Sequence, residues 1–408
     1  YRQFRRKVGW DCLLILCFRE KVMNSSNNLH KFAVIALLTA TALIVCSNGV
    51  FAAETMIYGR VSTSLRVTKA DGEPTKVDMN NEGSRWGLRT EEHINPDLSA
   101  KIWLESGFNS DDGGLSGTGG GNLDKMIFDR HAVLSLASKK WGEIGFGRMG
   151  SVRSAVMPYS LVLLPLDPVN GAYYDIASIS VMFGADPRAN NTVTYVSPRM
   201  RGFKFGASYS FATTDQEEPE ITSNNRLLAL GGNYEDGSIG VYFGATHVWH
   251  GKTSAASADR GKLYTRADAQ AYTLGATYRP TDAWKFYTAL QYHKNWRNVA
   301  GWKVDAGGGS ASDKEYGVDG LSAMVGVNYW FTHALRGTFS YYLFDGSHKR
   351  PGKADEEGMR QSINAVIDYR LSKTLLLYGT STYSKGDNRL DNSDCTKWVS
   401  RVGLMKFF

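Results

Sequence analysis

The sequence predicts an all-β protein: a 16-stranded antiparallel transmembrane β-barrel with a long loop, residues 150–190, folded into its lumen. Three observations lead to this prediction. Short stretches of alternating apolar and polar residues recur along the chain, long and short connections alternate between them, and aromatic residues gather near their ends. The 43 glycines and the aromatic content of 12% also suit a chain with many strands and tight turns.

Alternation of apolar and polar residues is the first observation. Within 319–332, for example, Leu321 and Val325 share one face, whereas Ser322 and Asn328 share the other. Successive side chains of a strand point to opposite faces, so we expect an apolar side toward lipid and a polar side toward a water-filled bore. The predicted strands are 56–68, 84–93, 98–108, 127–138, 142–149, 191–199, 202–213, 225–235, 238–250, 268–279, 283–295, 319–332, 335–346, 359–371, 374–385 and 396–408.

The connections are sorted by length. Long ones such as 250–268 and 296–318 alternate with short ones such as YEDGS and RPTDA, which puts eight long connections at one end and seven short ones at the other. Outer-membrane barrels show this arrangement, and a closed sheet leaves no unpaired edge in hydrocarbon. Residues 53–408 contain no run of 18 consecutive apolar residues, so we expect no transmembrane helix.

Aromatic residues near the strand ends support the same fold. Enrichment of strands in aromatic residues would explain them alone, but together with the sorted connections they favour girdles at the two membrane interfaces. The residues concerned are Tyr58, Trp86, Tyr209, Trp249, Tyr272, Tyr278, Trp284, Tyr292, Tyr329 and Trp398.

Residues 23–52 have the pattern of a secretory signal peptide. Lys31 precedes an apolar run, 32–45, and Val50 and Ala52 occupy the −3 and −1 positions of a small-residue cleavage site. A membrane anchor is the alternative, but the run is short for a span of about 20 residues. We therefore expect export and cleavage after Ala52.

Removal of this leader changes the charge and the cysteine content. Residues 1–22 precede the expected start and are interpreted as an upstream extension, and 53–408 form the predicted barrel. Residues 1–52 hold seven Lys/Arg and two Asp/Glu, which leaves 40 and 38 in the barrel and lowers the net charge from +7 to +2. This balance gives no support for nucleic-acid binding. Only Cys395 remains, so no intrachain disulfide is expected.

Residues 150–190 have no strand pattern, although regular strands flank them. Connections of this length are usually functional. The segment is apolar around Leu161–Leu166 and carries three spaced acids, Asp167, Asp175 and Asp186. We expect its leucines to lie against the barrel wall and its acids to face basic side chains across the bore.

Basic residues gather on the inward side of the early strands and would form that opposing wall. A positive wall facing the acids would set a transverse field that biases which ion passes. Alternatively, these residues pair with carboxylates such as Glu105 and only hold the strands together. The candidates are Arg60, Arg66, Arg85, Arg89 and Lys101, with Arg130 and Arg148 nearby.

Six stretches in the right order resemble the general diffusion porins of Gram-negative bacteria, over essentially all of residues 53–408. They are MIYGRVSTSL, GSRWGLRTEEHINPDLSAKIWLESGF, GEIGFGRMGS, NNTVTYVSPRMRGFKFGASYS, LSKTLLLYGTSTYSK and RVGLMKFF. The resemblance implies an outer-membrane homotrimer, in contact with lipid and lipopolysaccharide, that passes ions and small hydrophilic solutes. It also implies that Val402, Leu404 and Phe408 form the signal read by the barrel assembly machinery.

Two alternatives to a general diffusion channel stay open. A substrate-selective channel would have an aromatic lining, for which Trp103 and Tyr287 are hints, and a surface adhesin would use the long loops. Enzymatic chemistry finds little support, because the strand histidines lack partners at metal-ligand spacing and no G-x-S-x-G motif is present. We expect no catalytic residues, no metal and no cofactor.

Overall fold

The computed structural model describes residues 53–115, 126–169, 176–214, 217–251, 266–304, 315–350 and 352–408. The expectations for residues 1–22 and 23–52 and for Asp175 therefore lie outside the described residues. The strands are β1 (Glu54–Ala70), β2 (Lys76–Asn81), β3 (Arg85–His93), β4 (Leu98–Gly107), β5 (His131–Ser138), β6 (Gly142–Gly150), β7 (Arg188–Val196), β8 (Phe203–Ser210), β9 (Arg226–Glu235), β10 (Ile239–Trp249), β11 (Ala269–Tyr278), β12 (Trp284–Trp296), β13 (Asn298–Val299), β14 (Trp302–Lys303), β15 (Val318–Trp330), β16 (Leu335–His348), β17 (Glu356–Arg370), β18 (Leu375–Asn388) and β19 (Lys397–Phe407).

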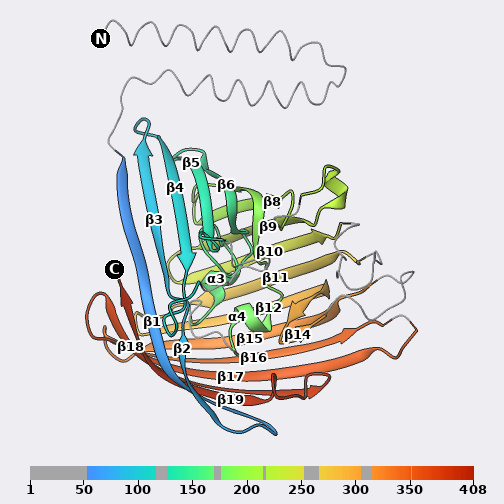
Figure 1. Ribbon diagram of the computed structural model, residues 1–408. Helices are drawn as coiled ribbons and strands as arrows, with labels where there is room; N and C mark the ends of the chain where they lie inside the picture. The colour runs from blue at the N-terminus through green and yellow to red at the C-terminus, as the bar shows by residue number, and fades with distance from the viewer. Residues whose placement is uncertain are drawn as a thin grey trace, which may run out of the picture. The chain divides into compact units, whose positions relative to one another are not determined.

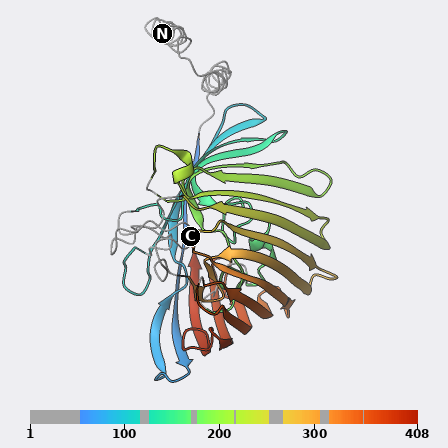
Figure 2. The same ribbon diagram turned by 90° about the vertical axis from the view of Figure 1, so that its right-hand side faces the viewer.

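These strands form a closed antiparallel barrel (Figures 1 and 2). β2 and β3 both pair with β1, so they form a single barrel strand that is interrupted at residues 82–84. The sheet closes where β1 pairs with β19, from Arg60 opposite Phe407 to Ala70 opposite Lys397. β13 and β14 form a separate two-stranded sheet. When β2 and β3 are counted as one strand, the barrel has sixteen strands, as the sequence predicts.

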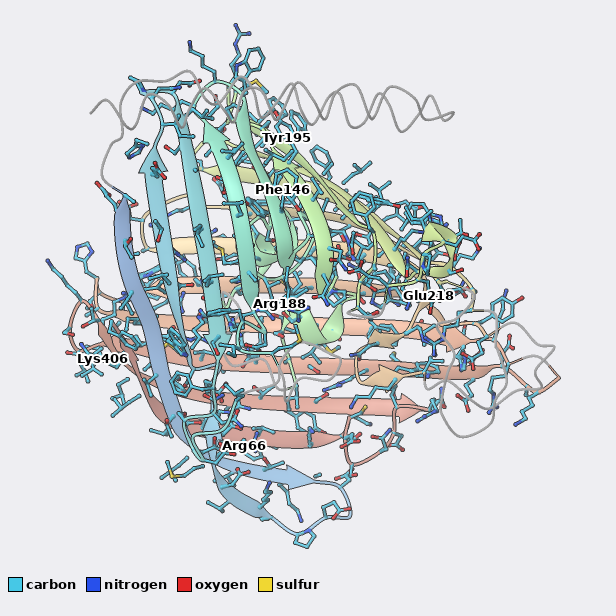
Figure 3. All side chains as sticks on the ribbon, turned by 45° about the horizontal axis from the view of Figure 1, so that its top comes forward. Arg66, Phe146, Arg188, Tyr195, Glu218 and Lys406 are labelled. Carbon is cyan, nitrogen blue, oxygen red and sulfur yellow. The ribbon has the colours of Figure 1, made fainter. Side chains whose placement is uncertain are left out.

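The two faces of the barrel strands differ as the alternation predicts. On β15, Leu321 and Val325 are 49% and 54% exposed, whereas Ser322 and Asn328 are buried. Phe146 on β6 and Tyr195 on β7 also lie on the exposed face (Figure 3). Aromatic side chains meet near strand ends, as Trp284 and Tyr329 do with ring centroids 4.4 Å apart. The outer surface is therefore the apolar one.

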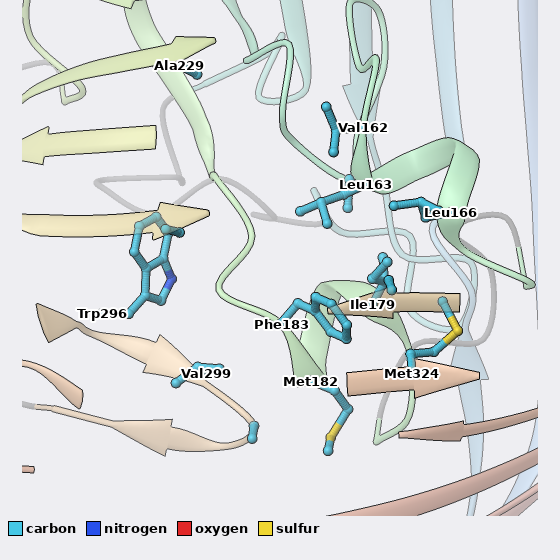
Figure 4. Close-up of a cluster of buried hydrophobic side chains, with 14 of the residues drawn as sticks. Val162, Leu163, Leu166, Ile179, Met182, Phe183, Ala229, Trp296, Val299 and Met324 are labelled. Atoms are coloured by element: carbon cyan, nitrogen blue, oxygen red, sulfur yellow. The ribbon is translucent and has the colours of Figure 1, made fainter. Parts of the chain in front are cut away.

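The connection between β6 and β7 contains two short helices, α3 (Leu163–Leu166) and α4 (Ile179–Met182), which the alternation of residues does not predict. Figure 1 shows both helices within the curve of the sheet. Val162, Leu163 and Leu166 are fully buried and join Phe183 in the main apolar cluster (Figure 4). The main core of this protein thus lies between the connection and the barrel wall. No described helix is long and apolar enough to cross a membrane.

Candidate functional site: the inner wall and the inward segment

Glycines on five strands make room for the described residues between β6 and β7, 151–169 and 176–187, which we call the inward segment. A Cβ atom at Gly275 of β11 would lie 2.5 Å from Leu166 Cδ1, and one at Gly326 of β15 would lie 2.5 Å from Pro168 Cγ. Gly206 of β8, Gly231 of β9 and Gly244 of β10 face the segment in the same way, with a Cβ atom 2.8–3.0 Å from Val152 or Val162. A side chain at any of these positions would push the segment off the wall.

Polar side chains of the same wall hold the backbone of the inward segment. Asn233 of β9 donates to the Leu161 carbonyl at 2.8 Å, and Ser322 of β15 donates to the Met182 carbonyl at 2.8 Å. Asn328 donates to the Pro168 carbonyl at 3.2 Å. Ser322 and Asn328 thus point inward as predicted, but the segment covers them, so they do not face open water.

Arg360 of β17 joins the inward segment to a second loop. Its guanidinium donates to the Ile176 carbonyl and to the Ala300 carbonyl, both at 2.9 Å, and Ala300 in turn donates its N–H to the Val181 carbonyl at 2.7 Å. Ala300 lies between β13 and β14, so this hairpin packs on the segment near α4. Cys395 Sγ lies 4.0 Å from the guanidinium, and burial raises the pKa of this thiol.

Asp186, one of the two described acids of the segment, pairs within the segment and not with the basic strands across the bore, unlike the sequence-based expectation. Asp186 forms a buried ion pair with Arg153, a residue of the segment itself, and accepts a hydrogen bond from Thr246 of β10 at 2.7 Å. Asp167 is also buried, next to the proline that packs on β15. The reason is local: Arg153 supplies a cation closer to Asp186 than any cation across the bore, a partner that periodicity does not reveal.

Three of the seven predicted basic residues are buried and hold the wall together. Arg60 donates to the Glu82 and Gly83 carbonyls at 2.8 and 3.0 Å. Arg130 Nε lies 2.6 Å from Glu105 Oε1, and Arg148 donates to the Asp129 carbonyl at 2.7 Å and to Asn190 Oδ1 at 2.6 Å. Arg130 therefore pairs with Glu105, as in the alternative in which the basic residues hold the strands together.

The other four basic residues keep more contact with solvent. Arg66 pairs with Asp78 of β2 at 2.7 Å, and Arg85 lies 3.7 Å from Glu105. Lys101 lies 3.3 Å from Glu143. Arg89 contacts aromatic rings, with its Cζ 3.8 Å from the Trp103 ring centroid and 4.3 Å from that of Tyr58.

A cavity of about 890 Å³ lies between these strands and the start of the inward segment. Arg89 and Lys101 line it, together with Lys204 of β8, Glu143 of β6 and Tyr159 of the segment. Tyr159 donates to Glu143 at 2.8 Å, and burial raises the pKa of its phenol. Lys204 was not among the predicted site residues, although its inward position follows from the alternation in 202–213.

The predicted assembly residues share the outer face of the last strand. Val402, Leu404 and Phe408 are 64%, 50% and 57% exposed. Phe408 closes the barrel, because its backbone exchanges hydrogen bonds of 2.9 and 3.1 Å with Gly59. A Cβ atom at Gly59 would lie 2.5 Å from Phe408 Cζ, so this glycine makes room for the terminal ring. Among the described residues, no group of three or more His, Cys, Asp or Glu side chains could hold a metal ion.

Comparison with known proteins places this architecture in a family. The chain is 27% identical over 398 residues to an outer membrane porin protein of Bordetella pertussis, covering 88% of this chain and 96% of that protein. It superposes with a TM-score of 0.63 and 22% identity on the anion-selective porin from Comamonas acidovorans, covering 88% and 100% of the two chains. OmpT of Vibrio cholerae in its trimer form gives a TM-score of 0.55 at 14% identity, with 88% and 100% coverage.

The family model described as Gram-negative porin matches residues 39–389. A closed barrel with an apolar outer face, with an inner wall that carries a packed segment and charged residues, fits that match. The chain belongs to the Gram-negative porin family, and is an outer-membrane channel for the passive diffusion of ions and small hydrophilic solutes.

Proposed function

We propose that the inward segment narrows the bore and directs solutes along the basic side of the wall, with a weak preference for anions. The observation that carries this proposal is the division of the inner wall. The segment packs on glycines of β8–β11 and β15, whereas the cavity is lined by Arg89 of β3 and Lys101 of β4, with Lys204 at the start of β8. A permeating ion close to these cations would be poorly screened from them.

The seven predicted basic residues divide into two roles under this proposal. Arg60, Arg130 and Arg148 hold strands and the loop end together through buried hydrogen bonds. The remaining residues, Arg66, Arg85, Arg89 and Lys101, act on passing ions together with Lys204. Asp167 and Asp186 fix the inward segment, and a role in the bore is proposed for neither. The anion selectivity of the Comamonas porin agrees with the proposed sign.

Shortening the inward segment tests the proposal. Replacing residues 154–184 by a short glycine–serine linker should raise single-channel conductance in a planar bilayer and admit larger solutes. The full-length protein should show stepwise, weakly selective conductance. Conductance that does not change on shortening would place the narrowest point elsewhere. Saturable block by one sugar would favour a substrate-selective channel, and absence of conductance would favour an adhesin.

We propose, further, that residues 23–52 are a signal peptide cleaved after Ala52 and that residues 1–22 are absent from the mature protein. The apolar run of 32–45 and the small residues before position 53 support this. Sequencing the N-terminus of the protein in outer membranes should give a start at residue 53. A start at or before Met23 would contradict the proposal.

For assembly we propose a homotrimer in contact with lipopolysaccharide, inserted by the barrel assembly machinery through Val402, Leu404 and Phe408. The trimer form of OmpT and the outward position of the three residues support this. Deleting Phe408 should lower the amount inserted in cells but leave the conductance of refolded protein largely intact. We also propose that the chain catalyses no reaction, as expected for a channel.

A further inference from the structure

Arg89 on β3 lines the cavity of about 890 Å³, and among the described residues no carboxylate lies at ion-pair distance from it. Its Nε atom is buried and makes no hydrogen bond within the described part of the chain. Other cations of the wall differ, since Arg66 pairs with Asp78 at 2.7 Å and Lys101 pairs with Glu143 at 3.3 Å. Something other than a carboxylate therefore holds the Arg89 side chain in place.

Two aromatic rings contact the guanidinium instead. Arg89 Cζ lies 3.8 Å from the Trp103 ring centroid and 4.3 Å from the Tyr58 ring centroid. Trp103 is the direct cross-strand partner of Arg89 on β4, and Tyr58 comes from β1, which pairs with the other edge of β3. The three side chains thus lie on adjacent strands. A ring attracts a cation through its electron-rich face but has no net charge, so it fixes the guanidinium without neutralising it.

Gly87 lets the Tyr58 ring reach across β3. Tyr58 is paired with Gly87, which is paired in turn with Glu105 of β4. A Cβ atom at Gly87 would lie 2.7 Å from Tyr58 Cζ, so a side chain there would displace the ring. The Tyr58 hydroxyl donates to Glu105 at 2.8 Å. Tyr58 therefore lies on the inner face of the barrel, and not in the girdle that the aromatic pattern suggests.

Glu105 is the fixed end of this chain of contacts. Its side chain is 4% exposed, and its two carboxylate oxygens lie 2.6 Å from Arg130 Nε and 3.7 Å from Arg85 Nε. The Tyr58 hydroxyl that donates to Glu105 also accepts a hydrogen bond from Trp103 Nε1–H. Because the carboxylate is held by two cations, the two rings that depend on it are held as well.

We propose that Tyr58 and Trp103 are positioning residues for anion passage, which hold the charge of Arg89 at the cavity and keep it away from carboxylates. Glu91 lies on the same face of β3, two residues from Arg89, and lines the same cavity. A guanidinium released from the rings could pair with Glu91, and its charge would then act less on a passing anion. The inference rests on the proposed passage of anions along this wall, and it makes two uncharged residues determinants of ion selectivity.

Reversal potentials in a KCl gradient across planar bilayers give the chloride-to-potassium permeability ratio, which tests the inference. Arg89→Gln should lower this ratio about twofold, as expected for loss of one accessible charge. Trp103→Leu and Tyr58→Leu keep every formal charge of the channel, yet each should produce at least about half of that fall. Trp103→Phe keeps a ring beside the guanidinium and should restore most of the ratio that Trp103→Leu loses.

Combined variants separate positioning of Arg89 from a general effect on the barrel. In the Arg89→Gln background, Trp103→Leu and Tyr58→Leu should produce no further fall in the ratio, because the guanidinium that the rings hold is absent. Trp86→Leu is the matched control, since it removes an indole from the exposed outer face of β3 and should leave the ratio unchanged. Equal falls with and without Arg89 would overturn the inference, because the rings would then act on the bore independently of this cation.

The single variants distinguish failure of the inference from failure of the proposed function. If Arg89→Gln lowers the ratio but neither Leu variant does, Arg89 acts on anions without help from the rings, and only the inference is lost. If Arg89→Gln leaves the ratio unchanged, the proposed role of Arg89 in anion passage fails together with the inference. The two Leu variants alter different strands, so if one fails to insert, the other decides the question.

Discussion

The inner wall of this barrel has two regions that follow the same alternation of residues but do different things. On β8–β11 and β15, inward glycines and small polar residues such as Gly275, Gly326 and Ser322 lie under the inward segment. On β3–β6, inward positions hold Arg89, Lys101 and Glu143, and a cavity lies against them. Alternation therefore specifies which face a residue is on, whereas residue size and charge decide whether that face is packed or wet.

The buried and the accessible cations show the same contrast. Arg153 and Arg360 are fully enclosed on the covered side, where they hold carbonyls and Asp186. Arg89 and Lys101 keep partial exposure on the open side. Guanidinium groups suit both tasks, since five donors in a plane can hold several backbone segments or bind an anion. Counting inward arginines therefore overestimates the charge that an ion meets in the bore.

An arginine introduced on each of three surfaces of the barrel should give the largest differences in the free energy of unfolding. Val325→Arg, on the lipid face, should destabilise the barrel by about 2–4 kcal/mol near the membrane midplane. Ser322→Arg, under the inward segment, should cost about 1–3 kcal/mol by overpacking. Ala137→Arg, inward on the cavity, should be close to neutral for folding and change conductance. Urea unfolding in lipid vesicles measures the free energies, and equal costs at positions 322 and 137 would contradict the division of the wall.

Glycine contacts allow a smaller and more local test. Gly326→Ala should cost about 1–3 kcal/mol, because the new Cβ atom would lie 2.5 Å from the rigid ring of Pro168. Gly379→Ala on β18 is the matched control, since its nearest contact is Ile367 Cγ2 at 3.4 Å. We expect the control to be neutral or slightly stabilising, as alanine is favoured over glycine in a strand. Similar free energies of unfolding for the two variants would show that Pro168 can move away from position 326 at little cost.

Much of this architecture follows from the sequence, because strand alternation and turn chemistry are local. The predicted strand 225–235 coincides with β9 within one residue, and the segment without a strand pattern is the one that packs against the wall. Apart from the pairing of a wall arginine with Glu105, individual contacts between distant residues do not follow from the sequence. Nothing in the local pattern around Asp186 reveals Arg153 as its partner, and nothing around Ser322 reveals Met182 above it. A signal did exist for Arg360, whose inward position follows from the alternation in 359–371.

Arg360 provides a test of how firmly the covered side is held. Arg360→Met should destabilise the protein by about 1–3 kcal/mol, because the buried carbonyls of Ile176 and Ala300 would each lose a charged donor. We also expect noisier open-channel current, since the inward segment and the β13–β14 hairpin would keep the Ala300–Val181 hydrogen bond but lose their shared guanidinium. Arg370→Met, at the exposed end of the same strand, is the control. If Arg360→Met has an open-channel current as quiet as that of the unchanged protein and the same free energy of unfolding, then Arg360 does not hold the inward segment to the hairpin.

The smallest expected effect is on ion selectivity, and it separates the two classes of cation most directly. Arg89→Gln, Lys101→Gln and Lys204→Gln should each shift the reversal potential in a KCl gradient toward cation preference, and the shifts should add in the triple variant. Each charge is close to the ion path, so the shift should shrink as salt rises from about 0.01 M to about 1 M and the screening length falls from about 30 Å to about 3 Å.

Arg60→Gln removes the same formal charge, but this cation is buried and donates to the Glu82 and Gly83 carbonyls. We therefore expect a loss of stability of about 1–3 kcal/mol and little change in reversal potential. Substitution of a cavity residue should therefore change the ion selectivity and leave the free energy of unfolding nearly unchanged. Substitution of the buried Arg60 should do the reverse. A reversal-potential shift in Arg60→Gln as large as that in Arg89→Gln would mean that total inward charge, not its accessibility, sets the selectivity of this channel.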